Sequence, residues 1–180
     1  MKCIFILLTC LVVYAQNTYA DCRLDPPTLE NFSKEEFQGL WYLTATYPSV
    51  FDKFTAVFHV LTLKGNTYCA DSVITPEESE KRELKLGTWE LLSYNSKMNI
   101  MYPDPEYMSG LYQVSATDYK NYMIMQGCPP ITGDQGIYTL YFRKRCPEPD
   151  VVDFAESALA ALYLNSSLFV QDPTLNCTEI

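Results

Sequence analysis

Few side chains in this sequence could take part in catalysis. His59 is the only histidine, so neither a histidine-rich metal site nor a pair of catalytic histidines can form. Cys69 would be a nucleophile only if a nearby cation lowered the pKa of its thiol, and the residues that follow it are Ala70 and Asp71. The sequence therefore predicts a protein that is not an enzyme and that holds no cofactor and no metal.

One acidic loop has the residue types that bind amines. Asp104 and Glu106 stand beside Tyr102 and Tyr107 in a segment broken by prolines. A carboxylate and aromatic faces together can hold an ammonium group. The alternative is that this loop is only solvated, as most surface loops are.

Composition limits the class of protein. The chain has 180 residues, of which 48% are apolar and 19% are charged, and this suits a single packed domain. Its net charge of −9 argues against nucleic acid and against an anionic membrane surface, because both are bound by cationic patches.

The first twenty residues have the pattern of a secretory signal peptide. Lys2 precedes a mainly apolar run that is too short to span a bilayer, and a small-residue exit ends at Ala20. Removal of residues 1–20 would leave one domain over residues 21–180. No later apolar segment approaches the length of a membrane span, so we expect a soluble extracellular protein.

Cysteines and glycosylation patterns agree with export. Five cysteines remain after residue 20, which predicts two disulfides and one free thiol among Cys22, Cys69, Cys128, Cys146 and Cys177. Three Asn-X-Ser/Thr patterns predict N-glycosylation at Asn31, Asn165 and Asn176.

Short segments rich in Tyr, Val, Thr and Phe predict strands. Their close spacing is typical of an antiparallel sandwich or barrel. Apolar residues then fall at helical spacing between Pro147 and Leu164, and a last extended stretch covers Leu168–Gln171. The eight predicted strands are Leu40–Tyr47, Phe54–Leu63, Thr67–Ile74, Glu83–Ser93, Lys97–Tyr102, Gly110–Ala116, Asn121–Gln126 and Gly136–Lys144.

Three short blocks resemble the sequence motifs of the lipocalins. Gly39 to Trp41 open the first predicted strand, Thr117 to Tyr119 stand between the sixth and seventh, and Arg143 ends the eighth. The blocks follow one another in the order of that family. Segments 40–54, 116–128 and 138–150 are most similar to insect lipocalins, namely cockroach milk-type and allergen lipocalins and the salivary lipocalins of blood-feeding bugs.

The resemblance implies an all-β fold. This is an eight-stranded antiparallel up-and-down barrel with one C-terminal α-helix and a short ninth strand. The motif residues would close one end of the barrel, with the Arg143 guanidinium over the Trp41 indole and Asp118 accepting backbone N–H groups. The residues expected in this structural role are Gly39, Trp41, Thr117, Asp118, Tyr119 and Arg143.

A barrel of this size holds one small ligand, and inward positions alternate along each strand. In the second strand the alternation leaves both faces open, because each carries one polar residue among apolar ones. Any lining residue can also be ordinary core. The predicted ligand-lining residues, which suit an apolar molecule with a polar group, are Leu43, Ala45, Tyr47, Phe58, Val60, Tyr68, Trp89, Ile100, Tyr102, Tyr112, Val114, Tyr138 and Leu140.

The resemblance also implies the disulfide pattern. Cys22 is expected to pair with Cys128, and Cys177 with Cys146 as in the milk-type proteins. Cys69 is the alternative partner of Cys177, as in the retinol-carrying lipocalins of vertebrates.

The resemblance implies a secreted carrier. It would bind a small hydrophobic or amphipathic ligand, fatty acid-like, for transport, storage or nutrition. Some bug lipocalins bind haem through a histidine, but His59 lies in a different part of the pattern, so no haem is expected. The alternative function is that of a salivary or venom lipocalin that sequesters biogenic amines or inhibits host haemostasis through its loops. Only this alternative would have a host protein as a partner.

Overall fold

The chain forms a β-barrel followed by one helix, as described by a computed structural model over residues 22, 24, 29, 31–79, 81–92, 96–103 and 108–177. The predicted signal peptide and the acidic residues Asp104 and Glu106 lie outside the described residues. All eight predicted strands are present. The elements are α1 (Lys34–Phe37), β1 (Gly39–Tyr47), β2 (Phe54–Lys64), β3 (Thr67–Pro76), β4 (Glu83–Leu91), β5 (Lys97–Met101), β6 (Gly110–Thr117), β7 (Tyr122–Cys128), η1 (Pro130–Gln135), β8 (Ile137–Phe142), α2 (Pro149–Ala161), η2 (Ser166–Leu168) and β9 (Val170–Gln171).

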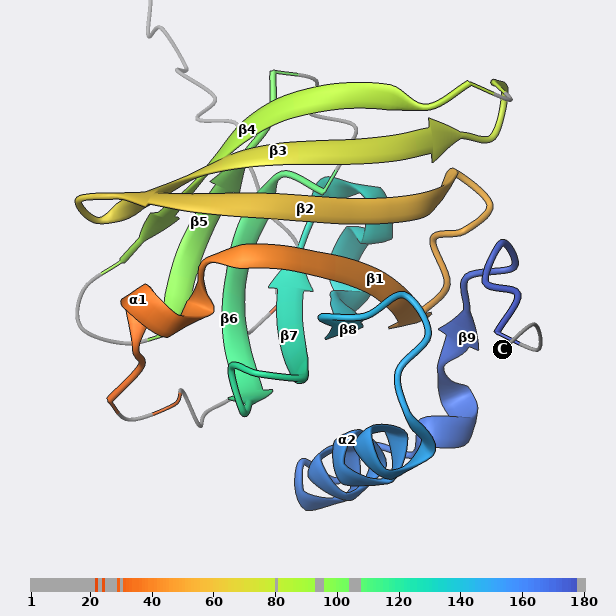
Figure 1. Ribbon diagram of the computed structural model, residues 1–180. Coiled ribbons are helices and arrows are strands. Elements are labelled where there is room, and N and C mark those ends of the chain that lie inside the picture. The colour runs from red at the N-terminus through yellow and green to blue at the C-terminus, as the bar shows by residue number, and fades with distance from the viewer. Residues whose placement is uncertain are drawn as a thin grey trace, which may run out of the picture.

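The eight long strands form a closed antiparallel barrel (Figure 1). Consecutive strands from β2 to β8 pair with one another, and β1 closes the barrel because it pairs with both β8 and β2. β9 pairs with β1 from outside, through Ala45 and Thr46. The predicted barrel, C-terminal helix and ninth strand are thereby confirmed.

Asp172 bridges β1 and β2 where their pairing ends. The β1–β2 register stops at Tyr42. Beyond it, the Asp172 N–H donates to the Thr44 carbonyl at 2.8 Å, and the Asp172 carboxylate accepts from the Ala56 N–H at 2.7 Å. The second carboxylate oxygen accepts from the backbone and hydroxyl of Thr174. The segment after β9 therefore completes the barrel wall at this point.

A bulge in β1 reverses which side chains face the interior. The register of β1 against β8 shifts between Leu43 and Ala45. Because a bulge adds one residue to a strand, the alternation beyond it is reversed. Ala45 accordingly packs under α2, and Tyr47 is 40% exposed with its ring 6.2 Å from that of Phe169. The prediction that Ala45 and Tyr47 line the barrel is wrong.

β2 turns the opposite face inward from the one predicted. His59 is buried in the barrel, whereas Val60 is 38% exposed and Phe58 lies outside with its ring 5.7 Å from that of Tyr42. The predicted lining by Phe58 and Val60 is therefore wrong. Both faces of β2 carry apolar residues, and strand composition alone does not fix register when that is so.

α2 covers the outer face of the barrel, where Ala155 and Leu159 are its buried residues. Their partners include Leu140, so the outer face of β8 is apolar because a helix covers it. Tyr141 on the same strand faces the interior, and Tyr138 shares the outward face of Leu140. The predicted inward orientation of Tyr138 and Leu140 is wrong for this reason.

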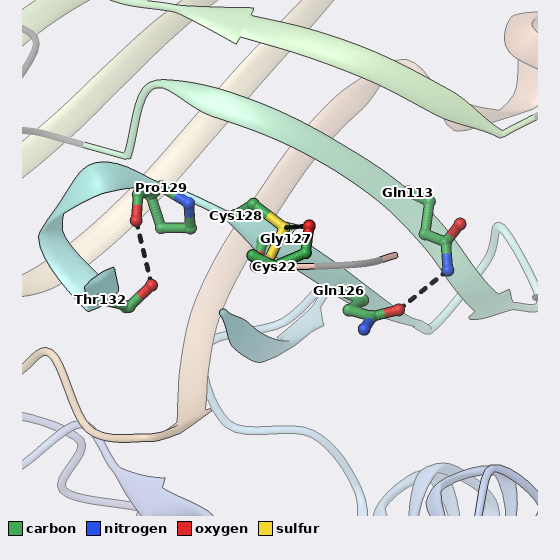
Figure 2. Close-up of a disulfide and its surroundings, with 7 residues drawn as sticks. All are labelled: Cys22, Gln113, Gln126, Gly127, Cys128, Pro129 and Thr132. Atoms are coloured by element: carbon green, nitrogen blue, oxygen red, sulfur yellow. Dashed lines mark hydrogen bonds between the residues drawn. A yellow bond between two sulfur atoms is a disulfide. The ribbon is translucent and has the colours of Figure 1, made fainter. Parts of the chain in front are cut away.

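Two disulfides anchor segments outside the barrel. Cys22 is bonded to Cys128 at the end of β7, with the Cα atoms 5.9 Å apart (Figure 2). Of the two partners expected for Cys177, the structure pairs it with Cys146, at a Cα separation of 5.5 Å. Cys69 is free and only partly buried, on the outward face of β3.

Arg143 closes one end of the barrel. Its guanidinium carbon lies 3.6 Å from the centre of the Trp41 ring. The same guanidinium donates to the backbone carbonyls of Glu36, Leu40 and Tyr119 at 2.9–3.1 Å. Gly39 has a φ of +104°, and a Cβ there would lie 2.9 Å from the guanidinium, so this position requires glycine.

The turn between β6 and β7 is held by Asp118. One carboxylate oxygen accepts backbone N–H groups from Lys120, Asn121 and Tyr122 at 2.7–3.1 Å. These N–H donors lower the pKa of Asp118, although partial burial opposes the shift. Thr117 accepts from the Tyr119 N–H at 2.9 Å, so the predicted turn residues adopt the expected structural roles.

Arg143→Met should destabilise the fold by about 3 kcal/mol, because it removes several charge-assisted hydrogen bonds and a cation–π contact. Lys144→Met is the matched control, since Lys144 is exposed and makes a surface ion pair with Glu148. Urea unfolding of the two variants tests this. Equal stabilities would contradict the role given to Arg143.

Candidate functional site

A chain of polar side chains crosses the otherwise apolar interior of the barrel. His59 Nδ1 lies 2.7 Å from Ser72 Oγ, and Ser72 Oγ lies 2.7 Å from the Tyr102 hydroxyl. The Trp89 indole N–H donates to the same Tyr102 hydroxyl at 3.1 Å. Four side chains from different parts of the sequence thus share one hydrogen-bonded network.

Neighbouring strands position this network. His59 on β2 is directly opposite Ser72 on β3, and Trp89 lies on the adjoining strand β4. Tyr102 follows β5 and lies over Gly87, where a Cβ would come within 2.5 Å of the ring. Glycine at this position therefore leaves room for the tyrosine.

Two further tyrosines lie beside the network. The His59 ring is 5.6 Å from that of Tyr141, and Tyr112 and Tyr141 belong to the same buried apolar cluster, against which Tyr102 packs. Tyr112 packs on Gly127, where a Cβ would overlap its ring at 2.1 Å. Because Gly87 and Gly127 have no side chains, the rings of Tyr102 and Tyr112 can pack directly on the backbone of the barrel wall.

Burial keeps every titratable member of this cluster uncharged. It lowers the pKa of His59 to about 3 and raises the pKa of Tyr102 to about 12. The pKa values of Tyr112 and Tyr141 are also raised, mainly by burial. At neutral pH the cluster therefore presents hydrogen-bonding groups without charge.

Two polar atoms of the cluster are buried without a hydrogen-bond partner among the described residues. They are His59 Nε2 and the Tyr112 hydroxyl, on side chains that are 2% and 1% exposed. An unpaired buried polar atom costs ~1–3 kcal/mol, so such atoms point to a missing partner.

One charged pair borders this cluster, because Lys85 on β4 stands directly opposite Ser72 on β3. Asp172 is the only buried carboxylate of the described chain, and it belongs to the outer wall rather than the interior. Near the open end, Lys85 pairs with Glu83 at 2.9 Å. No three His, Cys, Asp or Glu side chains in the described part of the chain come together as a metal site.

Apolar residues cover the open end of the barrel. Val50 and Phe51, in the connection between β1 and β2, are buried in the same apolar cluster as the interior. Met108 joins them from the segment before β6. A ligand entering at this end has to displace side chains of these connecting segments.

Seven of the thirteen predicted lining residues do face the interior. Tyr68 belongs to the closed end, because its hydroxyl donates to the Lys34 carbonyl at 2.9 Å. Tyr102 is partly buried against the same cluster and joins the polar network. The predicted residues within the interior cluster are Leu43, Tyr68, Trp89, Ile100, Tyr112 and Val114.

Sequence reasoning missed the centre of the network. His59 and Ser72 were not among the predicted lining residues, and neither was Tyr141. The pairing of β2 with β3 would have identified His59, because it places the only histidine opposite the buried Ser72. The alternation of apolar and polar residues within β2 does not show which strand residue lies opposite His59.

Two hollows also lie outside the barrel. One, of about 360 Å³, is bounded by α2 and the outer wall, with Ala45, Val152 and Phe169 in its lining. The other, of about 270 Å³, adjoins the separation of β1 and β2, next to Arg82, Arg145 and Asp172. They offer surfaces that are distinct from the interior cluster.

Known proteins resemble this chain over most of its length. Apolipoprotein D of Oryctolagus cuniculus is 23% identical over 158 residues, which cover 86% of this chain and 83% of the relative. The crystal structure of the cockroach allergen Per a 4 superposes with a TM-score of 0.70 at 18% identity, covering 84% of this chain and 94% of that chain. The tryptamine complex of the amine-binding protein of Rhodnius prolixus superposes with a TM-score of 0.68 at 20% identity, covering 87% and 88%.

No protein-family model matches the chain. The relatives and structural neighbours are nevertheless lipocalins, and the barrel closed by Trp41 and Arg143 has the same fold. The chain therefore has the lipocalin fold and resembles lipocalins in sequence, as expected. None of the names above denotes an enzyme.

His59 should remain uncharged far below the usual histidine pKa of 6.5, with a midpoint at about pH 3. ¹⁵N NMR of histidine-labelled protein measures this directly, because the chain has one histidine. In the unfolded chain the imidazole binds its proton near pH 6.5. Through His59, stability should therefore decrease as the pH falls from 6.5 towards 3. A midpoint near 6.5 in the folded protein would contradict the burial of this side chain.

Proposed function

We propose that this protein is a secreted, N-glycosylated carrier that binds one small apolar or amphipathic molecule, of fatty acid-like shape, inside its barrel. The observation that carries this proposal is the pair of buried polar atoms without partners, His59 Nε2 and the Tyr112 hydroxyl, within an apolar interior. Such a lining suits a ligand that is mostly apolar and has one polar group. Burial of the ligand's apolar surface would provide the binding free energy.

Export is supported by independent features of the chain. The two disulfides suit an oxidising compartment, and the first twenty residues have the pattern of a signal peptide. Asn31, Asn165 and Asn176, the three predicted glycosylation sites, are all exposed.

The amine-binding alternative has less support within the described residues. Its proposed acids, Asp104 and Glu106, lie outside them, and the described interior presents no buried carboxylate to an ammonium group. The amine-binding protein of Rhodnius prolixus has a similar fold in its tryptamine complex, but an identity of 20% supports only the similarity of fold. We therefore favour an apolar or amphipathic ligand.

Ala70→Phe should weaken binding of a fluorescent fatty-acid probe at least tenfold, because Ala70 is buried inside the barrel on β3 and the larger side chain occupies ligand space. Ala160→Phe, on the exposed side of α2, is the control and should bind as the unmodified protein does. Native mass spectrometry before and after solvent extraction provides a second measurement, with one ligand expected per chain.

Circular dichroism of Ala70→Phe establishes that the variant is folded. Unchanged probe affinity in the folded variant would place the bound molecule outside the barrel. Absence of any saturable binding, together with an empty barrel by mass spectrometry, would contradict the carrier function and favour a role of the loops in contacting another protein.

A further inference from the structure

The outer wall of the barrel has a hollow of about 270 Å³ where β1 and β2 separate. The pairing of these strands ends at Tyr42 and Phe58, whose rings lie 5.7 Å apart and belong to the lining. Leu175, in the segment after β9, lines the hollow as well. Pockets for drug-sized ligands begin at about 300 Å³, so this hollow suits a somewhat smaller molecule.

The backbone fixes the shape of this hollow. The register of β2 against β3 shifts between Thr55 and Phe58. Within this irregularity Ala56 has a φ of +53°, a left-handed conformation that residues with a side chain rarely adopt. The Asp172 carboxylate holds Ala56 in place because it accepts the Ala56 N–H at 2.7 Å. The hollow is therefore part of the barrel wall and does not depend on a loose loop.

Two of the four arginines border the hollow, although the protein is acidic overall. Arg82 lies just before β4 and Arg145 just after β8. The Arg145 guanidinium donates to the Thr174 carbonyl at 2.8 Å, and this uses only one of its five N–H donors. No hydrogen bond or ion pair joins Arg82 to another described residue. Both guanidiniums can therefore donate to a molecule in the hollow.

The charged groups of the lining leave an excess of one positive charge, because two guanidiniums face one carboxylate. That carboxylate belongs to Asp172, and its oxygens already accept from the Ala56 N–H and from the N–H and hydroxyl of Thr174. Glu83, at the start of β4, is paired with Lys85 at 2.9 Å. The hollow therefore favours a monovalent anion, and guanidiniums bind a carboxylate through paired hydrogen bonds.

The aromatic side chains favour a flat apolar body on that anion. The faces of Tyr42 and Phe58 are available to an aromatic ring, which gains from packing against other rings and against guanidinium planes. An ammonium group would meet two cations instead of a partner. The lining thus selects both the charge and the shape of a ligand.

We propose that this hollow is a second binding site, separate from the barrel interior, for a small aromatic carboxylate. Its carboxylate would accept hydrogen bonds from Arg82 and Arg145, and its ring would lie against Tyr42 and Phe58. The proposal goes beyond the carrier function and does not depend on it, because no member of the interior polar network lines the hollow.

Titration with 2-naphthoate at neutral pH tests the site, and 2-naphthylmethanol and 2-naphthylmethylamine serve as neutral and cationic analogues. Binding is followed by NMR of ¹⁵N-labelled protein. Naphthoate should bind about tenfold more tightly than either analogue, as expected for charge-assisted hydrogen bonds. The largest shifts should fall on the N–H groups of Ala56 and Thr174, which adjoin the hollow. Equal affinity of the three compounds would overturn the proposal.

Arg82→Gln should weaken naphthoate binding about tenfold, because it removes one of the two cations. The fold should not change, since Arg82 makes no bond to another described residue. Lys81→Gln is the matched control: it removes the same charge from the exposed preceding residue, which does not line the hollow, and should leave the affinity unchanged. Equal losses in the two variants would overturn the proposal.

Ala70→Phe separates this site from the interior. Naphthoate should bind this variant as tightly as the unmodified protein, because the larger side chain occupies only the space inside the barrel. Loss of binding in Ala70→Phe together with full binding in Arg82→Gln would place naphthoate in the interior. That result would overturn the proposal and leave the carrier function standing. Absence of saturable naphthoate binding would overturn the proposal as well.

Discussion

The barrel depends on the contact between Arg143 and Trp41 at its closed end. One guanidinium covers the indole face and also ties the carbonyls of Glu36, Leu40 and Tyr119 together. It thereby joins α1, the start of β1, the turn after β6 and the end of β8. Because this end is closed and packed, the interior above it is shielded from water. That shielding accounts for the neutral state of the polar cluster, in which the cost of burial outweighs the tendency of each group to ionise.

The interior combines two properties that rarely coexist without a reason. It is lined by apolar side chains, yet it contains a connected network that ends in an unpaired ring nitrogen at His59. A purely structural core would be more stable if such a polar atom were paired or replaced. A polar group of a ligand offers the missing partner, and the rest of the ligand gains from the apolar surroundings. The residues Val50, Phe51 and Met108 cover the open end, so they would have to move aside before a ligand reaches this point.

The sequence was sufficient for the features that depend on local chemistry. The strands, the C-terminal helix and the residues of the closed end follow from residue types and short motifs, because each acts within a few positions of the chain or in one known arrangement. The sequence did not show which side chains of each strand point into the barrel. A bulge reversed β1 after Leu43, and the cover of α2 made the outer face of β8 as apolar as its inner face. His59 was missed because both faces of β2 look alike until its pairing with Ser72 is known.

A crystal structure of the protein with a fatty acid bound tests the account most directly. The account predicts that the alkyl chain lies inside the barrel and that the polar head group lies within hydrogen-bonding distance of His59 Nε2 or the Tyr112 hydroxyl. A fatty acid bound instead in the hollow between α2 and the outer wall, with the interior closed and His59 Nε2 still without a partner, would contradict it.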